Sequence, residues 1–224
     1  MFTGIVQAIG KIEAIEPQDR DMRIFFSCGD LDKAGLDKGD SIAVNGVCLT
    51  VTDINDGKIA ADVSGQTLAC TTFSDIGRGH RINLEKALLS ATPLSGHFVS
   101  GHVDGVGIIN ALTDDGRSVR MRITVPQDLG KYIATKGSVC IDGVSLTVNH
   151  IAGVDFDVNI IPHTRTATII GEYTIGRRVN IEVDVIARYV ERLLSAGQGQ
   201  EKPPSTITHA FLMEHGYINK PQTD

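Results

Sequence analysis

Short runs of β-branched and other apolar residues, separated by turn-forming residues, dominate the hydrophobic pattern of this chain. Asn45-Gly46 and Asp142-Gly143 each separate two such runs, which is typical of a two-residue hairpin turn because glycine accepts a positive φ without steric cost. The pattern predicts about six short antiparallel strands in each half of the chain. A small sheet of this kind removes its exposed edges best by closing into a barrel. The clearest runs lie at residues 42–44, 47–52, 82–84, 119–125, 139–141, 144–148 and 179–185.

Helical patterns are few. Residues 30–36 and 126–134 are short helix candidates at matching places in the two halves, and a proline such as Pro126 is favourable at a helix start. Residues 185–195 predict one longer helix with an apolar face, which either the rest of the chain or a second copy of the chain covers. Residues 197–224 are rich in Pro, Gln and Thr and are expected to form a mobile tail, with one helical turn at 209–213. The apolar face of the longer helix consists of Ile186, Tyr189, Val190, Leu193 and Leu194.

The chain repeats itself at an offset of 97 residues. The block NGVCLTV at 45–51 returns as DGVSLTV at 142–148, TGIV at 3–6 returns as SGHV at 100–103, and INLE at 82–85 returns as VNIE at 179–182. Three blocks at one offset indicate a duplicated domain, and the period is too long for a solenoid. The sequence therefore predicts an all-β fold of two tandem six-stranded antiparallel closed barrels plus a C-terminal α-helix. The expected divisions are residues 1–97, 98–184, 185–196 and 197–224.

Composition narrows the classes of partner. The formal net charge is −6 and there is no basic run, so the electrostatic footprint of a general nucleic-acid-binding protein is missing. No apolar stretch approaches the ~18 residues of a membrane helix, and the N-terminus lacks the features of a secretory signal. We therefore expect a cytoplasmic protein with neither nucleic acid nor membrane as partner.

The four cysteines carry no metal-binding or disulfide pattern. None of them forms a CxxC pair, and no Cys/His cluster has zinc-finger spacing, so no metal site is expected. Disulfides are rare in cytosolic proteins of this size. Cys28, Cys70 and Cys140 are interpreted as small buried hydrophobic residues.

A few side chains differ in kind between the two copies. Ile5 corresponds to His102, and Cys48 corresponds to Ser145. Neutral drift explains any single pair, but a nucleophile-type residue at one position in both copies is harder to dismiss, since thiols and hydroxyls both bind and react. The sequence thus indicates two related but non-identical small-molecule sites.

Three further residues are candidates for chemistry in the second copy. His97 and His102, taken alone, are interpreted as satisfied loop histidines, whereas His102 paired with Ser145 becomes a proton carrier near neutral pH. Lys136 is either a solvated surface charge or a positive charge beside an anionic or carbonyl-rich ring.

Several blocks together resemble the riboflavin synthase family of duplicated lumazine-binding barrels, over about residues 1–195. They are MFTGIV at 1–6, VNGVCLTV at 44–51, IDGVSLTV at 141–148 and GHFVSGHVDG at 96–105. The resemblance implies Greek-key barrels and a trimerising helix, hence a homotrimer with sites between subunits. It implies conversion of two molecules of 6,7-dimethyl-8-ribityllumazine into riboflavin and 5-amino-6-(D-ribitylamino)uracil by four-carbon transfer, the last step of riboflavin biosynthesis, with no cofactor and no metal. Whether lumazine synthase is also a partner is left open.

The resemblance also implies site residues. Cys48 would support nucleophile addition at C7 of the lumazine, His102 and Ser145 would handle the proton of its 7-methyl group, and Asp184 would help to activate the attacking group. Orientation of the two rings can supply ~7–11 kcal/mol of the barrier. The expected first pocket consists of Gly4, Ile5, Val6, Cys48, Leu49, Thr50, Asp62, Val63, Ser64, Gly65, Gln66 and Thr67. The expected second pocket consists of Gly101, His102, Val103, Lys136, Ser145, Leu146, Thr147, Ile160, Ile161, Pro162, His163, Thr164 and Arg165.

Two other functions compete with this one. A non-catalytic lumazine or flavin antenna protein would keep the barrels, but the presence of Phe2, Cys48, His102 and Ser145 together favours the enzyme. An oligonucleotide-binding barrel pair would need basic grooves and stacking aromatics, against which a net charge of −6 and 5% aromatics argue.

Overall fold

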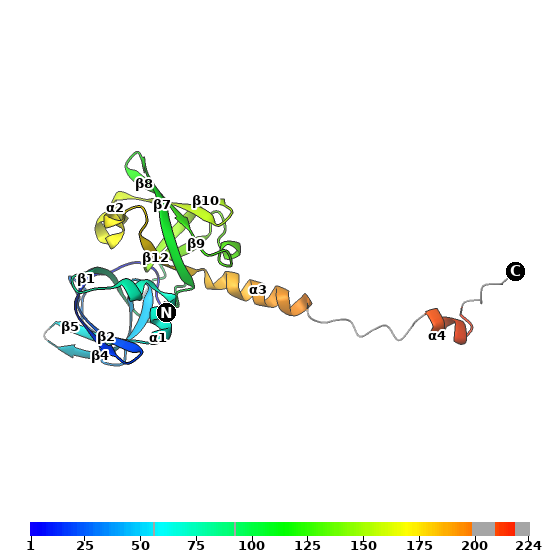
Figure 1. Ribbon diagram of the computed structural model, residues 1–224, viewed down its shortest axis with the longest axis horizontal. Coiled ribbons are helices and arrows are strands. Elements are labelled where there is room, and N and C mark those ends of the chain that lie inside the picture. Colours follow the sequence, from blue (N-terminus) through cyan, green and yellow to red (C-terminus); the bar gives the residue numbers. More distant parts are fainter. Residues whose placement is uncertain (56, 92, 199–208, 218–224) are drawn as a thin grey trace. The chain divides into compact units, whose positions relative to one another are not determined.

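The computed structural model describes residues 1–55, 57–91, 93–198 and 209–217, and over these residues the strands form two closed, six-stranded antiparallel barrels (Figure 1). Around the first barrel the strand order is β1-β2-β5-β4-β3-β6, and around the second it is β10-β11-β8-β7-β12-β9. The two orders are the same circuit, with β7 to β12 replacing β1 to β6. The predicted duplication of an all-β Greek-key barrel is therefore confirmed.

Each strand of the second barrel begins 97 residues after its counterpart in the first. Two β-bulges also recur at this offset, since the Ile12/Ala14 and Val51/Asp53 register shifts return at Ile109/Ala111 and Val148/His150. The first barrel contains β1 (Ala8–Gln18), β2 (Asp21–Ser27), β3 (Ser41–Val44), β4 (Val47–Asn55), β5 (Lys58–Val63) and β6 (Arg81–Lys86). The second contains β7 (Gly105–Asp115), β8 (Ser118–Thr124), β9 (Ser138–Ile141), β10 (Val144–Ala152), β11 (Asp155–Ile160) and β12 (Arg178–Val183).

The barrels have separate apolar interiors but meet at their predicted hairpin turns. Asn45 and Gly46 have φ values of 46° and 75°, and Asp142 and Gly143 have 44° and 82°, as a type I′ turn requires. A Cβ on Gly46 would lie 2.6 Å from the backbone nitrogen of Gly143. The two turns therefore face each other closely, and only glycine fits at this contact.

Two buried asparagines tie the barrels together across these turns. Asn83 donates through Nδ2 to the Asp142 carbonyl at 2.8 Å, and its twin Asn180 donates to the Asn45 carbonyl at 2.9 Å. The carboxamide oxygen of Asn83 accepts from the Ile169 N–H at 2.9 Å. These polar groups lie between the barrels, and each of them has a hydrogen-bond partner there.

The short helices differ from the sequence prediction. Residues 30–36 form turns instead of a helix, because Gly29 and Gly35 have positive φ values of 54° and 69°. Within 126–134 only the 3₁₀-helix η2 (Gly130–Tyr132) is helical. The short helices lie elsewhere, at α1 (Gly65–Cys70), η1 (Thr72–Asp75), α2 (Pro162–Ala167) and η3 (Ile169–Glu172).

The predicted C-terminal helix is confirmed as α3 (Val185–Gln198). Contacts divide the chain into a unit of residues 1–187, which holds both barrels, and a unit of residues 188–224. The helix α4 (His209–Glu214) lies where one helical turn was predicted. The expected mobility of the tail falls largely on 199–208 and 218–224, outside the described residues. None of the helices in the described part of the chain has the length and apolar character to cross a membrane.

The cysteines follow the prediction in part. Cys28 and Cys140 are buried, whereas Cys70 is exposed. It lies at the end of α1, a helix with no buried residue, so the prediction for this cysteine was wrong.

Candidate functional site

The opening segments of the two copies pair with each other between the barrels. The Phe2 N–H donates to the Val99 carbonyl at 2.7 Å, and the Val99 N–H donates back to the Phe2 carbonyl at 3.1 Å. Both side chains are buried. This bridge fixes the point at which the two segments cross.

Beyond the bridge, each segment lies against the barrel of the other copy. The Ser145 N–H donates to the Gly4 carbonyl at 2.7 Å, and the Cys48 N–H donates to the Gly101 carbonyl at 2.8 Å. The expected grouping placed Gly4 with Cys48 and Gly101 with Ser145, whereas these bonds join Gly4 to Ser145 and Gly101 to Cys48. Each opening segment thus lies between its own barrel and the barrel of the other copy.

Two buried glutamates at equivalent positions each anchor the opening segment of their own copy. Glu85 accepts from the Thr3 N–H at 2.6 Å, the Thr3 hydroxyl at 2.7 Å and the Gly4 N–H at 3.0 Å. Glu182 accepts from the Ser100 N–H at 2.6 Å, the Ser100 hydroxyl at 2.7 Å and the Gly101 N–H at 2.9 Å. Burial raises the pKa of both carboxyls, and these donors act against the shift.

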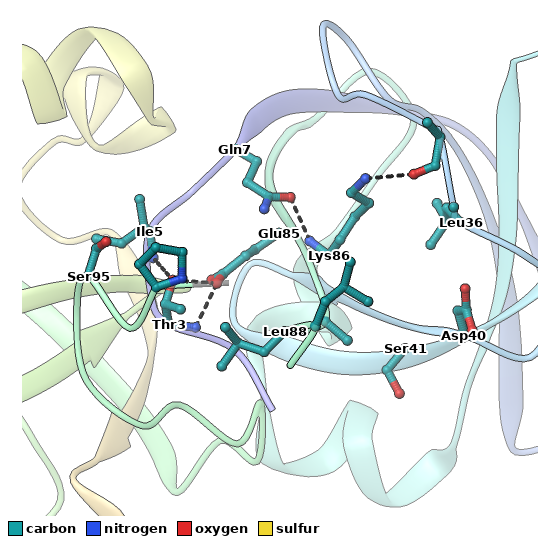
Figure 2. A pocket seen from close by; sticks show the side chains of 15 residues that line it. Thr3, Ile5, Gln7, Leu36, Asp40, Ser41, Glu85, Lys86, Leu88 and Ser95 are labelled. Atoms are coloured by element: carbon teal, nitrogen blue, oxygen red, sulfur yellow. Dashed lines mark hydrogen bonds between the residues drawn. The ribbon is translucent and has the colours of Figure 1, made fainter. Parts of the chain in front are cut away.

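A cavity of about 520 Å³ lies beside the anchored first segment. Figure 2 shows Glu85 reaching Thr3, with Ile5 and Ser95 on one side of the cavity and Lys86 on the other. Lys86 is held at its backbone N–H by Gln7 at 2.9 Å. Of the expected substrate contacts, only Ile5 lines this cavity.

On the Cys48 side, Cys48 is half-buried on β4 and Thr50 is exposed two residues further along the same strand. Thr50 lines a cavity of about 560 Å³ together with Gly39 and Arg23. The exposed Asp62, on β5, forms an ion pair of 2.6 Å with Arg23, which lowers the pKa of the carboxyl. The expected contacts Cys48, Leu49, Thr50, Asp62 and Val63 thus come from two paired strands, β4 and β5.

The helix α1 supplies the other expected contacts on this side. Ser64 caps it, accepting at Oγ from the Thr67 N–H at 3.2 Å, and the Gly65 N–H donates to Asp21 at 2.8 Å. Gln66 is exposed. The sequence signal for this helix was the Ser64 cap, which the prediction did not use.

On the Ser145 side, the neighbour of Ser145 is His97 and not His102. The Nδ1 atom of His97 lies 2.7 Å from the Ser145 hydroxyl oxygen. His102 follows Gly101 against the Cys48 side and is exposed, with its N–H bonded to the Ser100 hydroxyl at 3.2 Å. Within one chain, His102 therefore lies on the Cys48 side and not beside Ser145.

Asp184 stands where β12 ends and α3 begins. Its carboxylate accepts from the Ile186 N–H at 3.0 Å. It is close enough to His97 for its charge to raise the pKa of that ring, against the larger effect of burial, which lowers it. Asp184 therefore acts electrostatically on the histidine that contacts Ser145.

Lys136 occupies a strained backbone position beside β10. Its φ is 68°, and its N–H donates to the Val148 carbonyl at 2.8 Å. The first copy has Gly39 at the matching place, with φ 99° and the same bond to Val51 at 2.8 Å. A non-glycine residue in this conformation costs about 1–3 kcal/mol, and such strain is concentrated at functional sites.

The helix α2 completes the Ser145 side with residues 162–165. Ile160 is buried, whereas Ile161, Pro162, His163 and Arg165 are exposed. Ile160 and Arg165 line a cavity of about 240 Å³. Pro162 at the first helical position was an available signal for this helix. Val6, Val103, Leu146 and Thr164 are half-buried, and Thr147 is exposed.

The described residues hold no group of three or more His, Cys, Asp or Glu side chains that could bind a metal ion. Among the residues that shape the site, the sequence analysis missed Glu85, Glu182 and the role of His97. The repeated INLE and VNIE blocks contained both glutamates, so the duplication itself was the signal for them.

Comparison with known proteins gives concordant results. The profile of the lumazine binding domain family matches residues 3–87 and again 100–184. The chain is 44% identical to riboflavin synthase of Photobacterium phosphoreum over 218 residues, covering 97% of this chain and 100% of the relative. It is 39% identical to riboflavin synthase of Bacillus subtilis over 217 residues, again covering 97% and 100%.

Solved structures with a similar fold bind related heterocycles. The crystal structure of LumP complexed with riboflavin is similar with a TM-score of 0.75 and 28% identity, covering 82% of this chain and 99% of LumP. The crystal structure of LumP complexed with 6,7-dimethyl-8-(1'-D-ribityl) lumazine is similar with a TM-score of 0.73 and 27% identity, over the same shares.

Proposed function

Since this chain belongs to the riboflavin synthase family, with two lumazine binding domains, we propose that it converts 6,7-dimethyl-8-ribityllumazine into riboflavin. Two lumazine molecules react. One donates a four-carbon unit to the other, so that one riboflavin and one 5-amino-6-(D-ribitylamino)uracil leave. The substrate enters twice, in two different roles.

The observation that carries this proposal is the pair of crossed, non-identical sites. Cys48 with Gly101 and Ser145 with Gly4 are built by the same backbone bond in the two barrels. A binding protein for a single ligand needs only one reactive set of side chains, even where, as in LumP, the similar fold extends over 82% of this chain. A reaction between two copies of one molecule needs both sites, with different side chains at the point where their roles diverge.

We assign Cys48 to the lumazine that undergoes addition at C7, with His102 on the same side. We assign Ser145 to the lumazine that loses a proton from its 7-methyl group, with Asp184 and Lys136 near it. The positive charge of Lys136 would stabilise the anion that forms when this proton leaves. This role would explain why a lysine occupies a strained backbone position.

The proposal includes a homotrimer in which each working site lies between two chains. Its support is the exposure of the apolar face of α3, where Ile186, Tyr189, Leu193 and Leu194 are 59%, 68%, 74% and 66% exposed. Exposed apolar side chains at this spacing are typical of a helix that packs on a partner. Sedimentation of the purified chain tests the assembly, and co-sedimentation with lumazine synthase tests that association.

The direct test incubates the purified protein with 6,7-dimethyl-8-ribityllumazine and follows the fluorescence of riboflavin. We expect one riboflavin for every two lumazines consumed. The similarity to LumP favours a second candidate, an antenna protein that binds lumazine or riboflavin without converting it. Tight binding with no riboflavin formed would establish that candidate instead.

A further inference from the structure

His97 is a buried histidine in the segment that links the two barrels. Its side chain and backbone are 8% exposed, and its N–H donates to the Thr3 carbonyl at 3.1 Å. Thr3 is in turn held by Glu85. The backbone of His97 is therefore fixed to the anchored opening segment, and the ring is enclosed on the Ser145 side.

Among the described residues, the ring forms a hydrogen bond with the Ser145 hydroxyl. The distance from Nδ1 to Oγ is 2.7 Å, which is typical of a strong hydrogen bond. The other ring nitrogen, Nε2, is buried and has no hydrogen-bond partner among the described residues. Such an atom is costly to bury, so a purely structural role does not explain a histidine here.

The protonation state decides which atom donates. Burial lowers the pKa of His97, and the nearby Asp184 carboxylate opposes this shift. A neutral imidazole has one donor and one acceptor nitrogen. With the proton on Nε2, Nδ1 accepts from the Ser145 O–H, and the two lone pairs of Oγ are then turned away from the ring.

We propose that His97 is a positioning residue for the reaction, which fixes the Ser145 hydroxyl so that its lone pairs face the lumazine. The inference rests on the proposed function, since it concerns the same site. Asp184, at the start of α3, is the charged group that acts on the ring, and Glu85 acts on it only through Thr3. Without His97 the hydroxyl is free to rotate, and a misplaced reacting group loses on the order of 100-fold in rate.

Two substitutions separate the two ring nitrogens. His97→Asn places an amide oxygen near the position of Nδ1 and keeps an acceptor for the Ser145 hydroxyl. His97→Gln places its amide near the position of Nε2 and leaves the hydroxyl without this acceptor. His80→Gln is the matched control, because His80 also accepts a bond at Nδ1, from the Gly77 N–H at 3.0 Å, in the exposed turn before β6.

The experiment measures kcat and KM for riboflavin formation, together with lumazine binding and thermal stability of each variant. We expect His97→Gln to lower kcat by about 10- to 100-fold with KM changed less than about threefold, and His97→Asn and His80→Gln to stay within about threefold of the parent. In a Ser145→Ala background, His97→Gln should have no further effect on kcat, because the hydroxyl that it orients is gone.

Equal losses in His97→Asn and His97→Gln, or a full additional loss on Ser145→Ala, would overturn the inference. If His97→Gln does not fold, His97→Ala takes its place: a loss of kcat that disappears in the Ser145→Ala background supports the inference, and the same loss in both backgrounds overturns it. A parent protein that forms no riboflavin would instead contradict the proposed function, so the two failures are distinguishable.

Discussion

The N–H of Cys48 donates a hydrogen bond of 2.8 Å to the carbonyl of Gly101, a residue of the opposite copy. This bond makes the second copy's opening segment a wall of the first copy's site. Gly101 has a φ of 80°, and a Cβ on it would lie 2.6 Å from the Cβ of Cys48. The site therefore depends on a glycine outside its own barrel.

We predict that Gly101→Ala lowers turnover by about 100-fold, since the added methyl group displaces either Cys48 or the opening segment of the second copy. Gly116→Ala is the control, because Gly116 also has a positive φ, of 65°, but nothing lies within 4 Å of the added Cβ. Both variants carry backbone strain of about 1 kcal/mol. Steady-state kinetics beside urea unfolding separates the two effects, and equal turnover in the two variants would contradict the assignment.

Cys48→Ala and Ser145→Ala test whether these two side chains take part in the chemistry. We expect each to slow a single turnover by at least about 10-fold, because each removes a group that reacts or carries a proton in the proposed step. Ser74→Ala removes an exposed hydroxyl in η1 and should leave the rate unchanged. Rapid mixing with lumazine measures the step. Near-normal rates in both variants would remove the two residues from the reaction.

Asp142 makes stability depend on pH. Burial raises its pKa to about 6, although the Tyr173 hydroxyl and the Asn180 N–H donate to it. The stability that this shift contributes is present below the ordinary pKa of 3.8 and is lost as the pH rises through about 6. The first copy has Asn45 at the matching place, where the amide oxygen accepts from the Asn83 N–H at 2.7 Å.

We therefore predict that Asp142→Asn becomes more stable relative to the parent as the pH rises. The change between pH 4 and pH 8 should be on the order of 2–3 kcal/mol, since each unit of pKa shift corresponds to ~1.4 kcal/mol. Urea unfolding of both proteins at the two pH values measures it. A difference in stability that is the same at both pH values would show that Asp142 does not carry the buried charge.

Asn83 joins the barrels through groups that have no access to water. We predict that Asn83→Ala lowers the free energy of unfolding by about 2–4 kcal/mol, because the Asp142 carbonyl and the Ile169 N–H both lose a partner. Asn55→Ala removes an exposed asparagine bonded to Asp53 and should cost less than about 0.5 kcal/mol. Chemical denaturation measures both. Similar losses would mean that the interface is held by other contacts.

The duplicated fold was predictable from the sequence because the two copies keep the same turn residues. Asn45-Gly46 and Asp142-Gly143 indicated hairpins, and both turns have the expected dihedral angles. The six-residue helices α1 and α2 were not predicted because neither buries a residue, so they show no apolar periodicity. Residues 30–36 looked helical, but glycines at positive φ interrupt them.

The candidate site was predictable as a set of residues but not in its pairing. A repeat at one offset indicates that Gly4 and Gly101 are equivalent positions. It does not indicate which barrel each of them contacts. The His97–Ser145 contact could not be predicted for a similar reason. The two residues are 48 positions apart, and His97 lies in a linker without regular structure. Only three-dimensional contacts show that each opening segment, held by its own copy, also touches the other copy.

The position of the opening segments also bears on how such a tandem protein arises. A single copy, made alone, would keep its leading residues on its own glutamate, but its barrel would lack the wall that the other copy's leading residues supply. Two single copies would complete each other by packing together at these segments, and the present chain joins two such halves end to end. Fusion then lets each half accumulate its own changes, so that twin mouths became unequal.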